Sequence, residues 1–203
     1  MDNQNTTPTV PGTPFAGGFY AGRIRIDSQA FALIVAPKAE GEFDAEWNSS
    51  TKAVEDAASY FDGRANTLAM AAAGSELAKD ALRLQIGDHN DWYIPSQDEL
   101  EIIYRNLKPT TQGNYCWARS GINLSAVEPT RPYTPDFPKQ TEADAFKAGG
   151  AQAFDDAWYW TSTQHAATTD YAWVQYFGNG SQGYDHKSSE YRARAVRRLS
   201  IIE

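Results

Sequence analysis

The sequence is short of cysteine, of net positive charge and of long apolar runs, and each shortage excludes a class of protein. The 203 residues include one cysteine, Cys116, so the intrachain disulfides that hold small secreted domains together are excluded. A formal net charge of −8 disfavours nucleic-acid binding, which needs a basic surface. No apolar run approaches the length of a membrane span, so we expect no membrane insertion.

The first residues, MDNQNTTPTVPGTP, also lack the basic and apolar segments of a secretory signal peptide. Residues 1–14 are polar and rich in proline, which predicts a flexible arm, and residues 15–203 then form a single domain. We expect the protein to be made in the cytoplasm. It then either stays there or leaves without a signal peptide, for example in a virus particle released by lysis.

Aromatic residues are abundant instead, at 13% of the chain with 6 Trp and 11 Tyr. Many of them lie among polar residues in the stretch 158–199. Tyrosine offers a large contact area and a hydroxyl at little entropic cost, so tyrosine-rich surfaces favour recognition. The alternative is that the rings fill an irregular core, which we expect for most of the tryptophans.

The first part of the chain predicts a hairpin and several short helices. Residues 19–36 form two apolar or alternating runs on either side of Asp27-Ser28-Gln29, which predicts two strands and a tight turn. Residues 50–61, 66–73 and 75–85 predict three short helices.

A longer helix is predicted after Ser96. Ser96 and Glu99 have the spacing of a capping box, in which each side chain pairs with an otherwise free backbone N–H. We interpret both residues as structural rather than catalytic. Apolar residues then recur at helical spacing until Pro109 ends the helix, and they are Leu100, Ile103, Tyr104 and Leu107.

The rest of the chain predicts loops followed by strands. Closely spaced prolines make residues 110–157 a long loop-rich insertion, with one short helix around 140–148. Strands are predicted around 158–162, 171–177 and 192–199.

The last predicted strand carries a cluster of arginines. We expect their side chains to point outward and to form ion pairs with acids such as Asp98, Glu99 or Glu101. A site for phosphate or another acidic ligand is the alternative. The arginines are Arg192, Arg194, Arg197 and Arg198.

Several short motifs occur in order along the chain. They are DG at 62–63, NT at 66–67, WYIPS at 92–96, EL at 99–100, YWTST at 159–163, AW at 172–173, Phe177, NG at 179–180, Lys187 and RAVR at 194–197. Together these motifs resemble those of the Lcl C-terminal domain family, once called a domain of unknown function. The resemblance covers residues 19–199.

The resemblance implies an α+β fold of the C-type-lectin-like kind, with small antiparallel sheets, two or more helices and long loops. It relates the chain to the formylglycine-generating enzymes and to retroelement-diversified phage tropism proteins, in which a fixed frame displays variable residues. By this resemblance the frame includes Trp160, Trp173, Phe177, Val196 and Arg197. The residues expected to bind a ligand are Gln164, His165, Tyr171, Tyr176, Asn179, Gln182, Tyr184, Asp185 and His186.

Enzymatic chemistry finds little support in the residues. One cysteine cannot supply the cysteine pair of the formylglycine-generating enzymes, and the H-x3-H-x-E pattern of their iron-dependent relatives is absent. Cys116 could pair with a histidine as a nucleophile, but free cysteine is commonly buried and inert. We therefore expect no catalytic residues and no cofactor.

Metal binding is similarly disfavoured. His165 and His186 could hold a metal ion with Asp170 or Asp185, but loop histidines are more often solvated or in contact with a ligand. The lectin motifs that bind calcium are not matched, because Glu128-Pro129 is followed by threonine and no W-N-D sequence occurs.

The sequence thus favours a non-enzymatic ligand-binding module. We expect a phage virion protein, at a tail or fibre tip, that recognises a bacterial surface glycan or a protein such as a pilus. Other tail proteins are its expected neighbours, and the avidity of repeated sites favours a homotrimer. The alternatives are an intracellular or virion assembly protein with the same fold and, less favoured, an enzyme similar to the formylglycine-generating enzymes.

Overall fold

A tight hairpin begins the fold in the computed structural model, which describes residues 7–117 and 119–201. Strands β2 (Gly18–Ile26) and β3 (Gln29–Val35) pair antiparallel. Asp27 and Ser28 connect them with φ values of 47° and 68°. Two successive left-handed residues form a turn whose twist matches that of the flanking strands. The hairpin predicted for residues 19–36 is therefore confirmed.

The first sheet has the strand order β1-β2-β3-β9, with β1 at Pro14–Phe15 and β9 at Val196–Ser200. The chain just before β1 is also fastened to β2, because Gly12 N donates to Tyr20 O at 2.8 Å and Tyr20 N donates to Thr13 O at 2.9 Å. These bonds tie residues 12 and 13 of the predicted arm to β2, while residues 1–6 lie outside the described residues; the flexibility of the arm stays a prediction.

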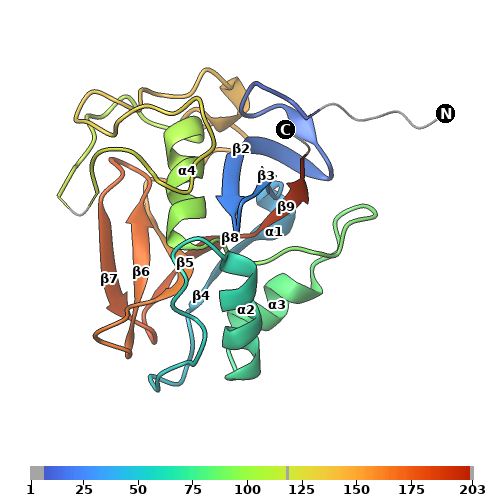
Figure 1. The fold of residues 1–203 in the computed structure, drawn as a ribbon, viewed down its shortest axis with the longest axis vertical. Coiled ribbons are helices and arrows are strands. Elements are labelled where there is room, and N and C mark those ends of the chain that lie inside the picture. The colour runs from blue at the N-terminus through green and yellow to red at the C-terminus, as the bar shows by residue number, and fades with distance from the viewer. Residues whose placement is uncertain (1–6, 118, 202–203) are drawn as a thin grey trace.

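The second sheet has the strand order β4-β8-β5-β6-β7 (Figure 1). All neighbouring strands in it are antiparallel except β5 and β8. Its strands are β4 (Glu42–Glu46), β5 (Trp158–Gln164), β6 (Tyr171–Tyr176), β7 (Gln182–His186) and β8 (Glu190–Arg194).

The strand predicted at 192–199 is in fact two strands, β8 and β9, that belong to different sheets. Between them Ala195 N donates to Gly41 O at 2.8 Å and Ala195 O accepts from Ala36 N at 3.0 Å. These bonds carry the chain from one sheet to the other. Strand β7 was not predicted, because Gly178, Gly180 and Gly183 interrupt the sequence pattern around it.

The helices are α1 (Lys38–Gly41), α2 (Gly63–Ala72), α3 (Glu76–Arg83) and α4 (Gln97–Leu107), with one 3-10 turn at Asp144–Phe146. Helices α2 and α3 confirm the two short helices predicted there. The helix predicted for 50–61 is wrong, because tertiary contacts hold this segment as loop: Val54 N donates to Gln164 Oε1 at 2.7 Å. The helix predicted around 140–148 is reduced to the 3-10 turn.

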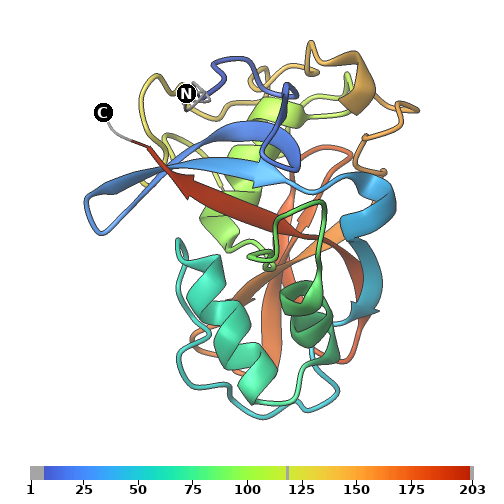
Figure 2. The ribbon, with the colours of Figure 1, turned by 90° about the vertical axis from the view of Figure 1, so that its right-hand side faces the viewer.

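Helix α4 lies between the two sheets, while α2 and α3 cover another part of the second sheet (Figures 1 and 2). The capping box of Ser96 and Glu99 is confirmed, and so is the predicted buried stripe of α4. That stripe packs in one core with Tyr159, Phe177 and Val196. The two sheets and the helices confirm the α+β class, and the C-type-lectin-like identity of the arrangement stays a prediction. Among the described residues no helix is long and apolar enough to cross a membrane.

Candidate ligand-binding surface

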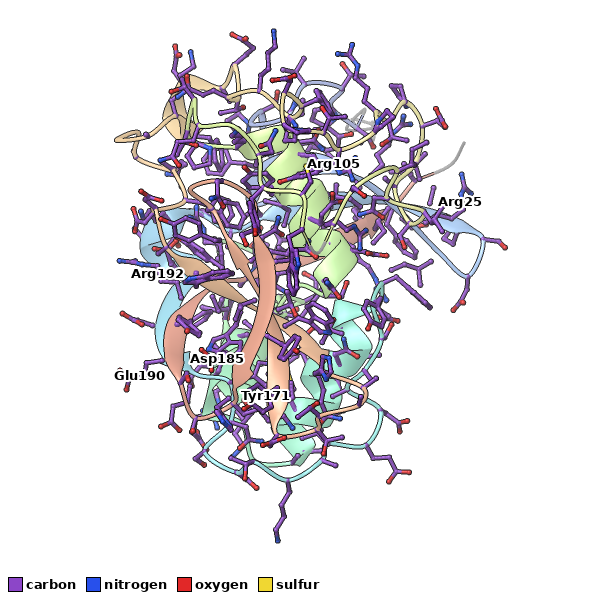
Figure 3. All side chains as sticks on the ribbon, turned by 90° about the vertical axis from the view of Figure 1, so that its left-hand side faces the viewer. Arg25, Arg105, Tyr171, Asp185, Glu190 and Arg192 are labelled. Atoms are coloured by element: carbon purple, nitrogen blue, oxygen red, sulfur yellow. The ribbon has the colours of Figure 1, made fainter. Side chains whose placement is uncertain are left out.

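Strands β6 and β7 place three cross-strand pairs on one face of the second sheet. The pairs are Tyr171 with His186, Trp173 with Tyr184, and Gln175 with Gln182. Residues directly opposite each other in a ladder share a face, and side chains alternate between faces along each strand. The three pairs therefore form one continuous row, with rings at one end and carboxamides at the other. Figure 3 shows this edge of the sheet, with Tyr171 and Asp185 labelled.

The ring end of the row belongs to a larger aromatic patch. Trp173 packs against Tyr184 with 5.6 Å between ring centroids, and Tyr60 lies 6.4 Å from Trp173. His165 lies 4.3 Å from Tyr184. Tyr60 and Tyr184 are 40% and 45% exposed, so the patch faces solvent. The aromatic patch consists of Tyr60, His165, Tyr171, Trp173, Tyr184 and His186.

Polar contacts fix the orientation of several rings in the patch. Tyr171 Oη lies 2.7 Å from His186 Nε2, and His186 Nδ1 lies 3.7 Å from Asp170. Thr168 N donates to His165 Nδ1 at 3.0 Å. These contacts restrict the rotation of the Tyr171, His165 and His186 side chains, so the geometry of this part of the patch is fixed by the fold.

The carboxamide end of the row forms a buried glutamine cluster, made of Gln97, Gln175 and Gln182. These three residues are 4%, 1% and 2% exposed, respectively. Gln97 Nε2 donates to Gln182 Oε1 at 2.7 Å. The indole N–H of Trp173, by contrast, has no acceptor. Among the described residues, the buried side-chain N and O atoms without a partner are Gln97 Oε1, Trp173 Nε1, Gln175 Nε2, Gln175 Oε1 and Gln182 Nε2. Such atoms each cost about 1–3 kcal/mol, so their concentration at one place needs an explanation.

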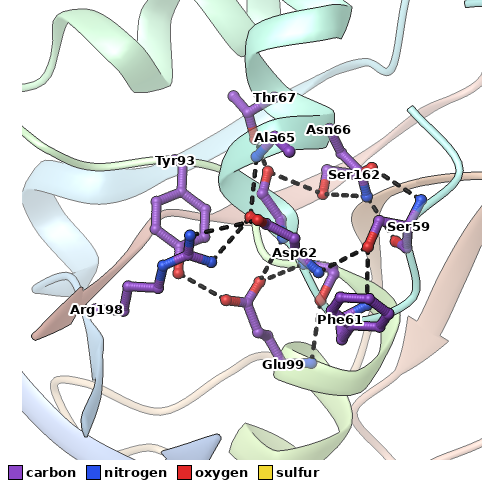
Figure 4. Close-up of polar contacts among 12 residues, drawn as sticks. Ser59, Phe61, Asp62, Ala65, Asn66, Thr67, Tyr93, Glu99, Ser162 and Arg198 are labelled. Carbon is purple, nitrogen blue, oxygen red and sulfur yellow. Dashed lines mark hydrogen bonds and ion pairs between the residues drawn. The ribbon is translucent and has the colours of Figure 1, made fainter. Parts of the chain in front are cut away.

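A second buried polar network lies at the same end of α4, and it is held together by hydrogen bonds around the Glu99 carboxylate (Figure 4). Tyr93 Oη donates to Glu99 Oε1 at 2.6 Å, while Ser96 N and Gly63 N donate to Glu99 Oε2 at 2.8 and 3.2 Å. Burial raises the pKa of Glu99 to about 7, although these hydrogen bonds and nearby Arg198 oppose the shift. Glu99 thereby joins the starts of α2 and α4, which supports its structural interpretation.

The arginine cluster forms ion pairs, but not with the predicted acids. Arg192 and Arg194 both contact Glu42, at 2.9 and 3.2 Å. Arg197 pairs with Asp91 at 2.6 Å and Arg198 with Asp62 at 2.8 Å. The prediction of Asp98, Glu99 and Glu101 as partners is wrong. Asp98 pairs instead with Arg119, and Glu101 pairs with Arg105.

The structure brings only part of the predicted site together. His165, Tyr171, Tyr184 and His186 lie in the aromatic patch, and Gln182 lies in the glutamine cluster.

Tyr176 and Asp185 lie on the opposite face of the sheet: the Tyr176 ring packs at a tilt against Trp158, and Asp185 accepts from Tyr191 Oη at 2.6 Å. Asn179 occupies the connection between β6 and β7, where its Oδ1 accepts from Ser181 N at 3.1 Å. These side chains hold the sheet and its turn, so they lie outside the candidate surface.

Gln164 is buried and structural, so its prediction as a displayed residue is wrong. Its Oε1 accepts from Val54 N at 2.7 Å and from Lys187 Nζ at 2.6 Å. Lys187 also lies 4.6 Å from the Trp47 ring centroid, and burial lowers its pKa to about 8. Together these residues tie the 52–54 loop to the second sheet.

Sequence reasoning missed four residues of the candidate surface. Trp173 was assigned to the frame, but it is half-buried and joins the aromatic patch, whereas Trp160 is fully buried as predicted. The alternation of YAWVQY already places Trp173 and Gln175 on the face of Tyr171. No sequence signal brings Tyr60 or Gln97 to this place, since both arrive through tertiary packing.

Two further side chains with reactive groups, those of Cys116 and Asp155, lie in surroundings that disfavour other chemistry. Burial raises the pKa of the Cys116 thiol, which disfavours its nucleophilic thiolate form. Asp155 pairs with Lys38 at 2.6 Å and with Arg192 at 2.9 Å. Within residues 7–117 and 119–201, no three His, Cys, Asp or Glu side chains gather so as to hold a metal ion.

The fold and this surface define an α+β domain that carries a patch of exposed rings beside buried, unpaired amides. The chain belongs to the Lcl C-terminal domain family, whose model matches residues 38–197. No curated protein matches the chain in a sequence comparison.

Proposed function

We propose that this protein is a non-enzymatic recognition module and that the aromatic patch is its binding surface. The observation that carries the proposal is the row of rings on β6 and β7, where Tyr184 is 45% exposed on the edge strand of the second sheet. Exposed aromatic clusters mark sites that gain contact area from a partner. The other face of β6 is buried at Ala172 and Val174 and anchors the strand, so the ring side chains of the patch are free to serve binding rather than folding.

The biological setting that we propose is a phage virion, at a tail or fibre tip. The ligand is a structure on the bacterial surface, either a glycan or a protein such as a pilus. Support comes from the resemblance to phage tropism proteins and from family membership of the chain. A homotrimer and contacts with other tail proteins would multiply weak individual contacts.

Binding to intact bacterial cells tests the proposal. The tagged protein, presented multivalently, is added to cells that retain or lack pili or surface polysaccharide. Tyr184→Ala should reduce cell binding at least about tenfold, which corresponds to about 1.4 kcal/mol, with little change in Tm. Leu68→Ala is the matched control, because Leu68 on α2 is also 45% exposed.

Two outcomes would count against the proposal. If Tyr184→Ala binds cells as well as the unsubstituted protein, the aromatic patch is not the binding surface. If the folded, multivalent protein binds no permissive cell, the alternative of an assembly protein with constant partners is favoured instead.

A further inference from the structure

We propose that a cavity between the first hairpin and α4 binds a small organic anion, and that Arg23 and Arg131 hold its acidic group. The cavity has a volume of about 770 Å³ and shares no residue with the aromatic patch. Arg105 in the cavity wall and Tyr171 of the patch lie in separate parts of the molecule (Figure 3). This second site is therefore independent of the proposed recognition surface.

Three parts of the chain form the walls of this arginine cavity. Strand β2 forms one wall, the second half of α4 another, and residues of the segment 126–137 a third. Asn106 Nδ2 donates to Ala21 O at 2.7 Å, which ties α4 to β2. Sites for small ligands typically enclose about 300–1,000 Å³, so this cavity is large enough for one.

Arg105 fixes the third wall against α4. It is only 8% exposed and forms an ion pair with Glu101. Its Nη1 donates to Arg131 O at 2.6 Å, and its Nη2 donates to Gly121 O at 3.0 Å. The charge of Arg105 is thus balanced within the fold, and its hydrogen bonds hold the backbone of Arg131 at the cavity.

Arg23 and Arg131, by contrast, have no acidic partner among the described residues. Arg23 Nη2 donates to the carbonyl oxygen of Glu128, and the Arg131 guanidinium lies 5.5 Å from the centroid of the Phe137 ring. Each guanidinium carries five N–H donors, so most of them remain available to a ligand. Burial raises the pKa of Tyr20 and Arg23 opposes this rise, which places the Arg23 charge near the Tyr20 hydroxyl in the cavity wall.

The charge of the cavity selects an anion. Among the described residues its lining contains three arginines and no Asp or Glu, although the whole chain has a net charge of −8. A concave surface with charge of one sign concentrates ligands of the opposite sign. Arginine suits a carboxylate or phosphate group in particular, because its planar guanidinium can donate two parallel hydrogen bonds.

The remaining lining selects an organic anion over an inorganic one. Apolar side chains in it include those of Ile102, Val127 and Phe137. An inorganic ion would leave this surface in water, whereas a ligand with an apolar body would cover it and gain free energy from its burial. Nucleic acid fits less well, because two unpaired arginines would neutralise few phosphates.

The first measurement is an NMR titration of the full chain with benzoate and with phenyl phosphate at low salt. Benzamide and benzylammonium are the neutral and cationic analogues, and inorganic phosphate lacks the apolar body. At least one aromatic anion should bind saturably and shift amide signals within residues 126–131 but not those of β6 and β7. The other three probes should bind at least about tenfold more weakly. The tighter of the two anions identifies the acidic group as a carboxylate or a phosphate.

Substitution of the two arginines tests their roles. Arg23→Gln and Arg131→Gln should each weaken binding of this anion at least about tenfold, because each variant loses charge-assisted hydrogen bonds. Tm should change little, since neither arginine pairs with an acid of the described residues. Arg64→Gln is the matched control: it removes the same charge from an exposed position on α2, outside the cavity, and should leave the affinity unchanged.

Three results would overturn the assignment of this site. One is that neither aromatic anion binds with a Kd below about 1 mM. Another is equal affinity for benzamide and the anions, which would show that charge is not recognised. The third is unchanged affinity in both Arg23→Gln and Arg131→Gln. None of these results bears on the cell binding of Tyr184→Ala, so failure here is distinguishable from failure of the proposed function.

Discussion

Gln97 and Glu99 are two residues apart in the first turn of α4, and both are buried, yet their surroundings differ. Glu99 uses both carboxylate oxygens, which accept from Tyr93, Ser96 and Gly63. Gln97 donates one hydrogen bond to Gln182 and leaves its carbonyl oxygen unpaired. The Glu99 carboxylate completes a hydrogen-bond network within the fold. The Gln97 carboxamide belongs to a cluster of amides in which several N and O atoms have no partner.

This difference separates polar residues that complete the fold from those whose hydrogen-bonding groups the fold leaves unpaired. A buried network with every group paired stabilises one arrangement of the chain. A buried cluster with unpaired groups costs stability, and proteins tolerate such a cost mainly at functional sites. The comparison predicts that removing the Glu99 carboxylate lowers the stability of the protein, whereas removing the paired carboxamides of the glutamine cluster together does not.

The largest expected effect is the loss of Glu99. Glu99→Ala leaves the Tyr93 hydroxyl and two backbone N–H groups unpaired in the interior, so it should destabilise the protein by about 3–5 kcal/mol. Urea unfolding at pH 6 measures this change. A loss below about 1 kcal/mol would show that the network does not hold the starts of α2 and α4 together.

The next effect is a dependence of stability on pH. Burial raises the pKa of Glu99 from 4.5 to about 7, so the folded protein holds this proton more tightly than the unfolded chain. The contribution of Glu99 to the free energy of unfolding is therefore fully present below pH 4.5. It is lost as pH rises to 7, by about 3 kcal/mol in total.

Glu99→Gln isolates this contribution, because the amide can occupy the same place without ionising. The unfolding free energy of the unsubstituted protein minus that of Glu99→Gln should fall as pH rises from 4.5 to 7. A difference that stays constant over this range would mean that Glu99 does not titrate there.

A smaller effect of opposite sign is expected in the glutamine cluster. Gln97→Met alone removes the bond to Gln182, whereas the double substitution with Gln182→Met removes both partners and their unpaired atoms. The double variant should exceed either single variant in stability by about 1 kcal/mol. A thermodynamic cycle of the four proteins measures this coupling, and additive effects would contradict the comparison.

Much of the frame could be predicted from local sequence signals. The turn at Asp27-Ser28, the capping box of Ser96 and the apolar stripe of α4 depend on nearest neighbours along the chain, and the structure confirms them. The family motifs likewise fall at buried or paired positions such as Trp160 and Glu99. Local geometry fixes these features, so a pattern of a few residues is enough to identify them.

The candidate surface could be predicted only in part. Alternation within YAWVQY places Tyr171, Trp173 and Gln175 on one face, but it does not say which face is exposed. Gln164 looked like a displayed residue and is buried against Lys187, while Tyr60 came from a segment wrongly predicted as helix.

The sequence by itself determined the α+β class, the family and four of the six residues of the aromatic patch, which are His165, Tyr171, Tyr184 and His186. The tertiary structure decided which polar residues are paired and which are not. Hydrogen-bond satisfaction depends on partners distant in the chain: Gln97 meets Gln182 across 85 positions, and Glu99 meets Gly63 across 36. Only the folded arrangement brings such groups within bonding distance, and it is there that the two neighbours on α4 acquire different roles.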